Sequence, residues 1–326
     1  MAHAGPDFYD DDAVFATYQG RRQRPDSPND TMEKPVIVQL IGEVAGKHVL
    51  DLGCGDAAIG RDLLQRGAAS YLGVEGSHKM AALARQTLAG TPGQVVMQTI
   101  EAWTAPAAAF DLTVSRLVFH YVADLTPVFA AVFRSLAGGG KFVFSVEHPV
   151  ITSCNRGWPA GTRRQDWVVD DYFSTGERVT SWMGGTVKKY HRTVEDYFRL
   201  LRDAGFEVEA LREACPQRNR FDDPQTYERR KRIPLFLVLA ARKAPCKESD
   251  MASSPTHDNA SNFPSGIGKP ALRALDAAGY TRLEQLANVR EADLGKLHGM
   301  GPKSIGLLHD ALAAQGLAFA DDTSVS

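Results

Sequence analysis

A glycine-rich loop, VLDLGCGDAAIG at residues 49–60, limits the folds open to this chain. An apolar run leads into Gly53 and Gly55 and a helical pattern follows, which predicts a strand, a tight turn and a helix in that order. Glycines in such a turn let the backbone approach a ligand closely, and ligands of open α/β sheets bind outside the carboxyl ends of the strands. The loop therefore predicts an α/β sheet with a ligand site at the end of this strand.

The acids around the loop bear on the class of ligand. Asp51 and Asp56 flank the glycines, and Glu75 follows the next apolar run at the spacing expected of a ribose-binding carboxylate. The loop also satisfies the GxGxxA dinucleotide pattern, but a pyrophosphate needs a helix N-terminus without the negative charge that Asp56 supplies. Asp51 and Asp56 favour a cationic ligand instead. S-adenosylmethionine has an ammonium, a sulfonium and a ribose diol, and it has no phosphate.

Strand and helix patterns alternate over residues 34–243, which predicts a parallel sheet covered on both faces. The predicted strands are residues 47–52, 70–75, 94–99, 110–115, 141–146, 206–212 and 234–240. The predicted helices are residues 34–44, 57–66, 77–88, 127–136 and 193–204, with Ser77 and Thr193 as N-caps.

Several segments together carry a family resemblance over roughly Phe8 to Lys243. VLDLGCG, YLGVEGS, FDLTVSRLVFHYV, GGGKFVFSVEHP and the terminal PLFLVLAARK resemble the class I S-adenosylmethionine-dependent methyltransferases of the small-molecule type. The resemblance implies a Rossmann-like methyltransferase fold with a mostly parallel seven-stranded sheet. It also implies transfer of a methyl group from S-adenosylmethionine to an oxygen or nitrogen atom of a small-molecule acceptor.

The resemblance further implies a set of cofactor contacts. The loop would cradle the methionine part, the acid that ends the second strand would take the ribose hydroxyls, and the segment after the third strand would line the adenine. The residue that ends the fourth strand would present its backbone to the methionine part, and an N-terminal helical flap over residues 8–35 would add two side chains. The loop contacts are Asp51, Gly53 and Gly55, and the ribose contact is Glu75. The adenine contacts are Thr99, Ile100 and Glu101. The backbone contact is Arg116, and the two side chains of the flap are Tyr18 and Arg24.

Three histidines are candidates for a catalytic base, which is needed only if the acceptor must lose a proton. His120 and His148 follow the fourth and fifth strands, and His191 lies where the chain returns to the core. Each could instead have a structural role: His120 could pack over the cofactor, His148 could belong to a turn, and His191 could make a structural hydrogen bond.

Residues 150–192 form a 43-residue insertion that is too long for an ordinary connection. It holds three of the four tryptophans, and residues 166–173 and 185–191 alternate as strands would, around turns at STGE and MGG. We expect a lid over the acceptor, with a dimer contact as the alternative.

The chain changes character after residue 243. Residues 244–265 are rich in Ser, Pro and Asn, which predicts a flexible linker. Residues 266–319 contain two similar segments, SGIGKPALRAL and HGMGPKSIGLL, that resemble helix-hairpin-helix domains and predict a small all-α domain. Residues 320–326 are expected to be a disordered tail.

The role of this C-terminal domain stays open. Its glycines could direct amides at a phosphate beside Lys303. Residues 262–326, however, carry six Lys and Arg against seven Asp and Glu, a net charge of −1. Weak nucleic-acid contact, protein contact or self-association, and a passive role are therefore all kept.

Composition narrows the classes of protein to which this chain can belong. The 326 residues, 44% of them hydrophobic and with a net charge of −2, predict two domains without a general affinity for nucleic acid. There is no apolar run of the ~18–20 residues that a membrane span needs. Four dispersed cysteines suggest neither a disulfide framework nor a zinc site, and a cytoplasmic location is expected.

A nucleic-acid methyltransferase recruited by the C-terminal domain is the alternative function. Against it, residues 115–122, SRLVFHYV, hold neither a [DNS]PP[YF] motif to stack an extruded base nor a Pro-Cys nucleophile.

Overall fold

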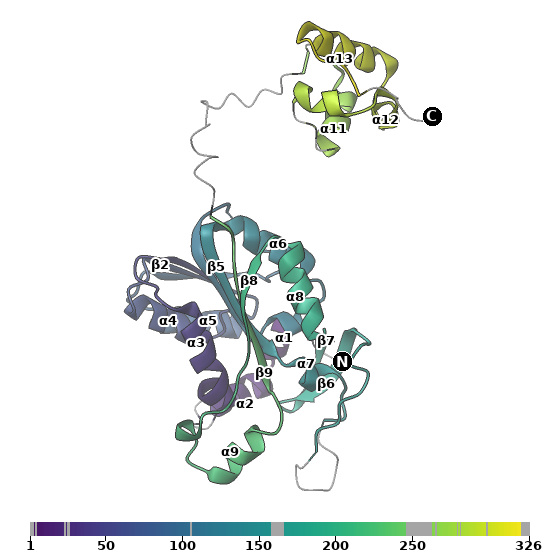
Figure 1. Cartoon of the computed structure of the whole chain (residues 1–326). Helices are drawn as coiled ribbons and strands as arrows, with labels where there is room; N and C mark the ends of the chain where they lie inside the picture. Colours follow the sequence, from purple (N-terminus) through teal and green to yellow (C-terminus); the bar gives the residue numbers. More distant parts are fainter. Residues whose placement is uncertain are drawn as a thin grey trace. The chain divides into compact units, whose positions relative to one another are not determined.

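The computed structural model describes residues 3, 5–22, 24, 27–104, 106–157, 166–245, 263–264, 266–278, 280, 282–297 and 299–320. The chain divides into two compact units, residues 1–248 and 249–326 (Figure 1). Each unit is described by itself. No helix among the described residues is long and apolar enough to span a membrane.

The first unit is built on a seven-stranded sheet in the order β3-β2-β1-β4-β5-β9-β8. The strands β1 to β5 run parallel to one another, and β9 is antiparallel to both β5 and β8. The predicted mostly parallel seven-stranded sheet is therefore confirmed. Its strands are β1 His48–Leu52, β2 Ser70–Glu75, β3 Gly93–Met97, β4 Phe110–Arg116, β5 Leu136–Glu147, β8 Glu207–Glu213 and β9 Phe236–Arg242.

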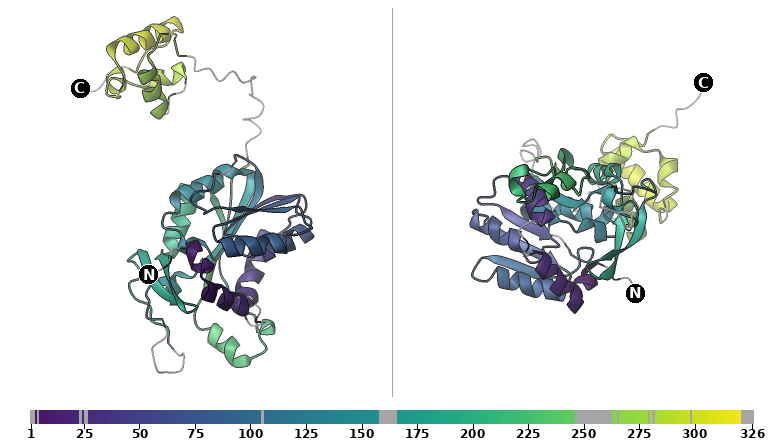
Figure 2. Two further views of the ribbon diagram at one scale, coloured as in Figure 1. Left: turned by 180° about the vertical axis from the view of Figure 1, so that it is seen from behind. Right: turned by 90° about the horizontal axis from the view of Figure 1, so that it is seen from below.

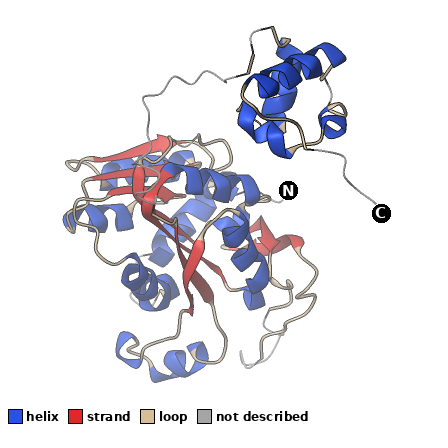
Figure 3. Cartoon of the chain, turned by 45° about the horizontal axis from the view of Figure 1, so that its top comes forward, coloured by secondary structure: helices blue, strands red, loops and turns tan. Residues whose placement is uncertain are grey.

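Helices cover both faces of the sheet (Figure 3). The helices α3 to α5 lie on one side and α6 and α8 on the other (Figure 1). Successive strand residues alternate between two hydrophobic cores: Val49 faces one core and Leu50 the other. This alternation is what a two-sided sheet requires. The helices are α3 Lys34–Ile41, α4 Ala58–Gln65, α5 His78–Thr87, α6 Thr126–Ser135, α8 Val194–Asp203 and, between β8 and β9, α9 Pro224–Arg230.

Local sequence signals fix the starts of two of these helices. The Ser77 hydroxyl accepts a hydrogen bond from the amide of Met80 at 3.2 Å. Thr193 and Asp196 form a reciprocal capping box at the start of α8. Both predicted N-caps are confirmed, because such caps satisfy amides that have no partner within the helix.

The insertion contains a two-stranded hairpin, β6 Gly176–Trp182 and β7 Gly185–His191, next to the short helix α7 Pro149–Thr152. The strand predicted over residues 166–173 is wrong, since the described residues there form no strand. Met183 and Gly184 both have positive φ, 48° and 83°, as a tight hairpin turn requires. That turn pairs β7 with the residues directly before it, so residues 166–173 have no strand partner.

An N-terminal segment bridges the sheet domain and this hairpin. It comprises α1 Gly5–Asp10 and α2 Asp12–Arg22, and it is followed by η1 Asn29–Glu33 (Figure 2). The Asp10 carboxylate accepts hydrogen bonds from the Ser77 hydroxyl at 2.6 Å and from the Lys79 amide at 3.1 Å, at the start of α5. At its other end, His3 pairs with the edge of β7 through the backbone of Thr186 and Lys188, at 3.0 Å each. The segment is therefore tied down on two sides.

The described elements of the second unit are all helical: α11 Lys269–Ala277, η4 Leu283–Asn288, α12 Glu291–Leu294 and α13 Pro302–Ala314. They enclose a core that includes Leu275, Leu286 and Leu308, each fully buried. The resemblance to helix-hairpin-helix domains stays a prediction. Most of residues 244–265 and of the tail lie outside the described residues.

Candidate functional site

A cavity lies at the carboxyl ends of β1, β2 and β4, and residues of α1 and α2 form one of its sides. It is the position where open α/β sheets bind ligands. The described residues that line it include every predicted cofactor contact except Arg24. These are Asp51, Gly53, Gly55, Glu75, Thr99, Ile100, Glu101, Arg116 and Tyr18.

The glycine loop is shaped for close approach. Gly53 has φ +71° and Gly55 has φ +59°, conformations that side chains disfavour. A Cβ atom at Gly53 would also lie 2.5 Å from a methyl carbon of Val118. The amide of Gly53 donates to the carbonyl of Val74 at 2.8 Å, which holds the loop against the end of β2.

Asp51 offers an acceptor that the protein itself leaves unused. Its side chain is 1% exposed, its Oδ2 accepts a hydrogen bond from the Tyr71 hydroxyl at 2.6 Å, and its Oδ1 has no partner among the described residues. Burial raises the pKa of Asp51 to about 7, against the opposing effects of the Tyr71 hydrogen bond and the Arg116 charge. A buried acceptor without a partner is costly. An ammonium group in the cavity would satisfy it.

Glu75 is held in place at the end of β2. Its Oε2 accepts a hydrogen bond from the Gly55 amide and its Oε1 one from the Ser77 amide, each at 2.9 Å. Burial raises its pKa. Each carboxylate oxygen can accept a second hydrogen bond, so Glu75 can receive the two hydroxyls of a ribose.

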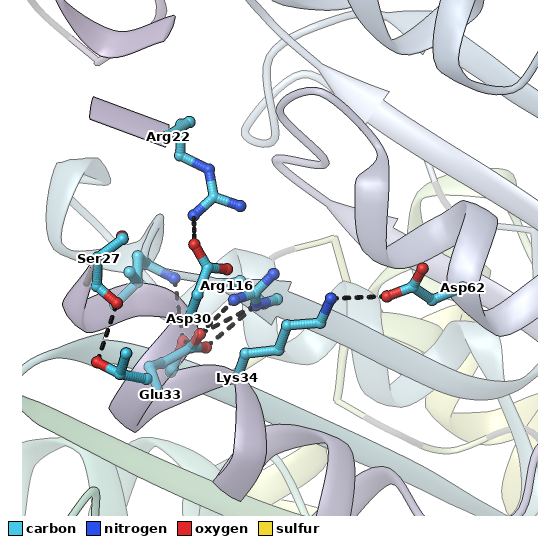
Figure 4. Close-up of polar contacts among 10 residues, drawn as sticks. Arg22, Ser27, Asp30, Glu33, Lys34, Asp62 and Arg116 are labelled. Carbon is cyan, nitrogen blue, oxygen red and sulfur yellow. Dashed lines mark hydrogen bonds and ion pairs between the residues drawn. The ribbon is translucent and has the colours of Figure 1, made fainter. Parts of the chain in front are cut away.

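Arg116 is fixed on the cavity by a buried acid of η1. Its Nε lies 3.2 Å from both oxygens of Glu33, and its Nη2 pairs with the same carboxylate (Figure 4). Glu33 is fully buried and also accepts a hydrogen bond from the Ser145 hydroxyl at 2.7 Å. The resemblance implied a backbone role for Arg116, but its guanidinium also acts on the cavity. Its positive charge partly opposes the effect of burial, which raises the pKa of Asp51 and of Tyr18.

The second arginine of the cavity is Arg22 rather than Arg24. Tyr18 and Arg22 are four residues apart on α2, which puts them on one helix face. Both line the cavity, and Arg22 Nη1 pairs with Asp30 Oδ2 at 2.9 Å (Figure 4). Arg24 follows the end of α2 and is exposed. The spacing from Tyr18 was the sequence signal that identifies Arg22.

Two of the three candidate histidines have structural partners at both ring nitrogens. His148 accepts from the Val150 amide at 3.2 Å and pairs with Glu213 at 3.0 Å. The nitrogens of His191 lie 2.8 Å from the Thr152 hydroxyl and 2.8 Å from a backbone carbonyl. Neither ring is among the described residues of the cavity lining. The structure therefore does not bring His148 and His191 to the cavity with the predicted cofactor contacts, and their catalytic role stays a prediction.

His120 lies directly behind the cavity lining. It is 2% exposed, its ring centroid is 4.4 Å from that of Tyr121, and its Nδ1 accepts a hydrogen bond from the Glu147 amide at 3.4 Å. Burial lowers the pKa of His120 to about 4, so the imidazole is neutral at pH 7.

The structure adds an aromatic and charged group beside the cavity. Tyr9 and Tyr121 line it, with their hydroxyl oxygens 3.3 Å apart. Behind Tyr121, the Lys189 ammonium lies 2.7 Å from both oxygens of Glu147, an ion pair between the hairpin and the end of β5. These contacts join segments far apart in the chain, so no local sequence pattern predicts them.

Comparisons with known proteins identify the family of this fold. Residues 50–144 match the family described as "Methyltransferase domain". A solved S-adenosylmethionine-dependent methyltransferase from Mesorhizobium loti is 35% identical, with a TM-score of 0.61. The match covers 68% of this chain and 100% of that one.

Two curated relatives extend the comparison. An uncharacterized protein from Haemophilus influenzae is 30% identical over 248 residues, 72% of this chain and 96% of that protein. Trans-aconitate 2-methyltransferase from Acidovorax ebreus is 34% identical over 143 residues, 43% of this chain and about half, 49%, of that enzyme.

The fold, the cavity and the relatives point to the same cofactor. The glycine loop permits close approach, the free oxygen of Asp51 suits an ammonium group, and Glu75 suits a ribose diol. S-adenosylmethionine has both groups. The chain belongs to the S-adenosylmethionine-dependent methyltransferases.

Proposed function

We propose that this methyltransferase acts on an oxygen or nitrogen atom of a small-molecule acceptor. The observation that carries the proposal is the cover over the cofactor cavity. Gly5, Pro6 and Tyr9 of α1 line the cavity directly. A site covered by the enzyme's own chain suits a small acceptor better than a base within a polymer.

The inserted hairpin supports this cover. Phe8 and Val14 of the N-terminal helices form a small core with Met183 and Val187 of the hairpin. Gly76 allows Pro6 of α1 to pack directly against the backbone after β2, because a Cβ atom at Gly76 would lie 2.5 Å from Pro6. We therefore propose that residues 150–192 act as a lid that works together with α1 and α2.

S-adenosylmethionine, when bound, supplies a methyl group already activated by its sulfonium. The protein chain itself positions the cofactor and the acceptor and excludes water from the cavity. In our proposal Asp51 holds the ammonium, Glu75 the ribose hydroxyls, and Arg116 with Arg22 the carboxylate. The segment Thr99 to Glu101 lines the adenine.

We propose His120 as the base for a hydroxyl acceptor, because its ring packs against Tyr121 of the cavity lining. Its Nδ1 accepts a hydrogen bond from the Glu147 amide at 3.4 Å, so the proton of the neutral imidazole is on Nε2. In our proposal His120 takes the acceptor proton at Nδ1, which first requires that this hydrogen bond opens. An acceptor that attacks through a neutral amine would not need this step.

A relative supports the small-molecule assignment. The name of the Acidovorax ebreus enzyme states a small carboxylic acid as its substrate. The match spans about half of that enzyme, so only the class of acceptor is carried into the proposal.

The test uses the full chain and S-adenosylmethionine with a deuterated methyl group. The protein is incubated separately with the low-molecular-mass fraction and with the total nucleic acid of a cell extract, and products are read by mass spectrometry. We expect label in a small molecule with wild type and none with Asp51→Ala, which should not hold the cofactor. Label confined to nucleic acid, or to neither fraction, would overturn the proposal. The first result would establish the alternative function.

A further inference from the structure

Three tyrosine rings from separate elements meet on the cofactor cavity. Tyr9 lies on α1, Tyr18 on α2 and Tyr121 on η2 Phe119–Tyr121. The centroid of the Tyr9 ring is 5.4 Å from that of Tyr18 and 6.3 Å from that of Tyr121, with interplanar angles of 82° and 88°. All three residues line the same cavity. Both pairs pack edge to face, so the three rings form one aromatic cluster on the cavity wall.

The rings remain uncharged under ordinary conditions. Burial raises the pKa of Tyr9 to about 12, and it raises the pKa of Tyr18 and of Tyr121 further. Uncharged aromatic faces carry partial negative charge and attract cations. The Tyr18 hydroxyl would lie 4.0 Å from a Cβ atom at Gly55, so the side chain of Tyr18 extends to the glycine loop with its hydroxyl end.

The charges around these rings do not oppose a cation. The cavity is lined by Asp51, Asp56 and Glu75, while its two arginines are paired with Asp30 and Glu33. The ammonium of Lys189 lies 5.7 Å from the centroid of the Tyr121 ring. That charge is balanced by Glu147, both of whose oxygens are 2.7 Å from it.

We propose that Tyr9, Tyr18 and Tyr121 form an aromatic cage that recognises the positive sulfonium of the cofactor. The cage would thereby distinguish S-adenosylmethionine from its uncharged product, S-adenosylhomocysteine. Methyl transfer removes this charge, because the electron pair of the broken S–CH3 bond stays on sulfur and the acceptor atom forms the new bond. A ligand can shift a conformation only by its differential affinity. Since α1 and α2 carry two of the rings, loss of the charge weakens their hold on the product and favours its release.

The test measures the affinity of the full chain for both ligands by calorimetry. Tyr18→Leu should weaken S-adenosylmethionine binding about 10-fold, the size of one desolvated cation–π contact. S-adenosylhomocysteine binding should stay within about twofold, since its thioether has no charge for the ring to attract. Tyr18→Phe keeps the ring and should bind both ligands as wild type does. Phe15→Leu, an aromatic of the same helix outside the described cavity lining, is the matched control.

Equal losses for the two ligands would overturn the cage, because they would show that Tyr18 only packs the N-terminal segment. Unchanged affinities for both ligands would overturn it as well. Tyr9→Leu and Tyr121→Leu repeat the comparison should Tyr18→Leu fail to fold. Sinefungin carries an amine in place of the sulfonium. Its affinity should change in every variant by the same factor as the affinity of S-adenosylmethionine.

Discussion

Replacing Asp51 with asparagine is expected to weaken S-adenosylmethionine binding about 100-fold while leaving the folded chain at least as stable as wild type. Removing one partner of a buried, hydrogen-bonded charge pair costs several kcal/mol of binding free energy. Asparagine keeps the shape of the side chain and can still accept the Tyr71 hydrogen bond. It cannot offer a charge to an ammonium group.

The same substitution should change the response of stability to pH. The pKa of Asp51 is raised by burial from 3.8 to about 7, so between these values the folded state binds the proton that the unfolded state releases. The free energy of unfolding therefore falls as pH rises through this window, and above it the folded chain carries the uncompensated charge. The Asp51→Asn variant should lack this dependence and should have a higher unfolding temperature than wild type above about pH 7.

Cofactor affinity has the opposite pH dependence. The ammonium binds the ionised form of Asp51, so wild-type affinity should decline as pH falls below about 7 and the variant should lose that decline. Calorimetric titrations and thermal unfolding from about pH 4 to about pH 9 measure both effects. Asp62→Asn, a surface carboxylate paired with Lys34, serves as control. Wild-type affinity in Asp51→Asn would contradict the assignment.

Arg116→Met is expected to lower the free energy of unfolding by about 3–5 kcal/mol, because it leaves Glu33 buried without its cation. For a domain of this size that corresponds to a fall of about 10 °C in unfolding temperature. The double variant Arg116→Met, Glu33→Gln should recover most of the loss, since the introduced glutamine amide needs no counterion. That amide can still accept the hydrogen bond from Ser145.

Chemical denaturation of the two single variants and the double variant gives the coupling energy directly. Arg22→Met is the matched control: its pair with Asp30 is more exposed, so its loss should cost less than about 1 kcal/mol. A double variant no more stable than Arg116→Met would show that the ion pair is not the source of the effect.

Features encoded in contiguous residues were predictable from the sequence. The sheet follows from buried strand runs separated by helices, and the starts of α5 and α8 follow from the caps at Ser77 and Thr193. Asp51 and Glu75 were identified because the glycine loop fixes which strand ends meet the ligand. In each case the determining interactions lie within one strand–helix unit.

Features that depend on distant contacts were not predictable in the same way. Glu33 faces Arg116 across 83 positions, and Lys189 faces Glu147 across 42. The candidate histidines were chosen by their place after strands, yet the partners of His148 and His191 come from other segments, at Glu213 and Thr152. The turn at residues 183–185 and the strand after it were predicted, but the partner strand β6 was not, because residues 176–182 show no clear alternation of apolar residues.

The most direct test of the central claim is a crystal structure of the full chain with S-adenosylhomocysteine bound. The account predicts the ligand in the cavity at the ends of β1, β2 and β4, with its amino group hydrogen-bonded to Asp51 Oδ1 and its ribose hydroxyls on Glu75. Its adenine should lie along Ile100 and Glu101. A ligand bound elsewhere, or one in this cavity that leaves Asp51 Oδ1 without a donor, would contradict it.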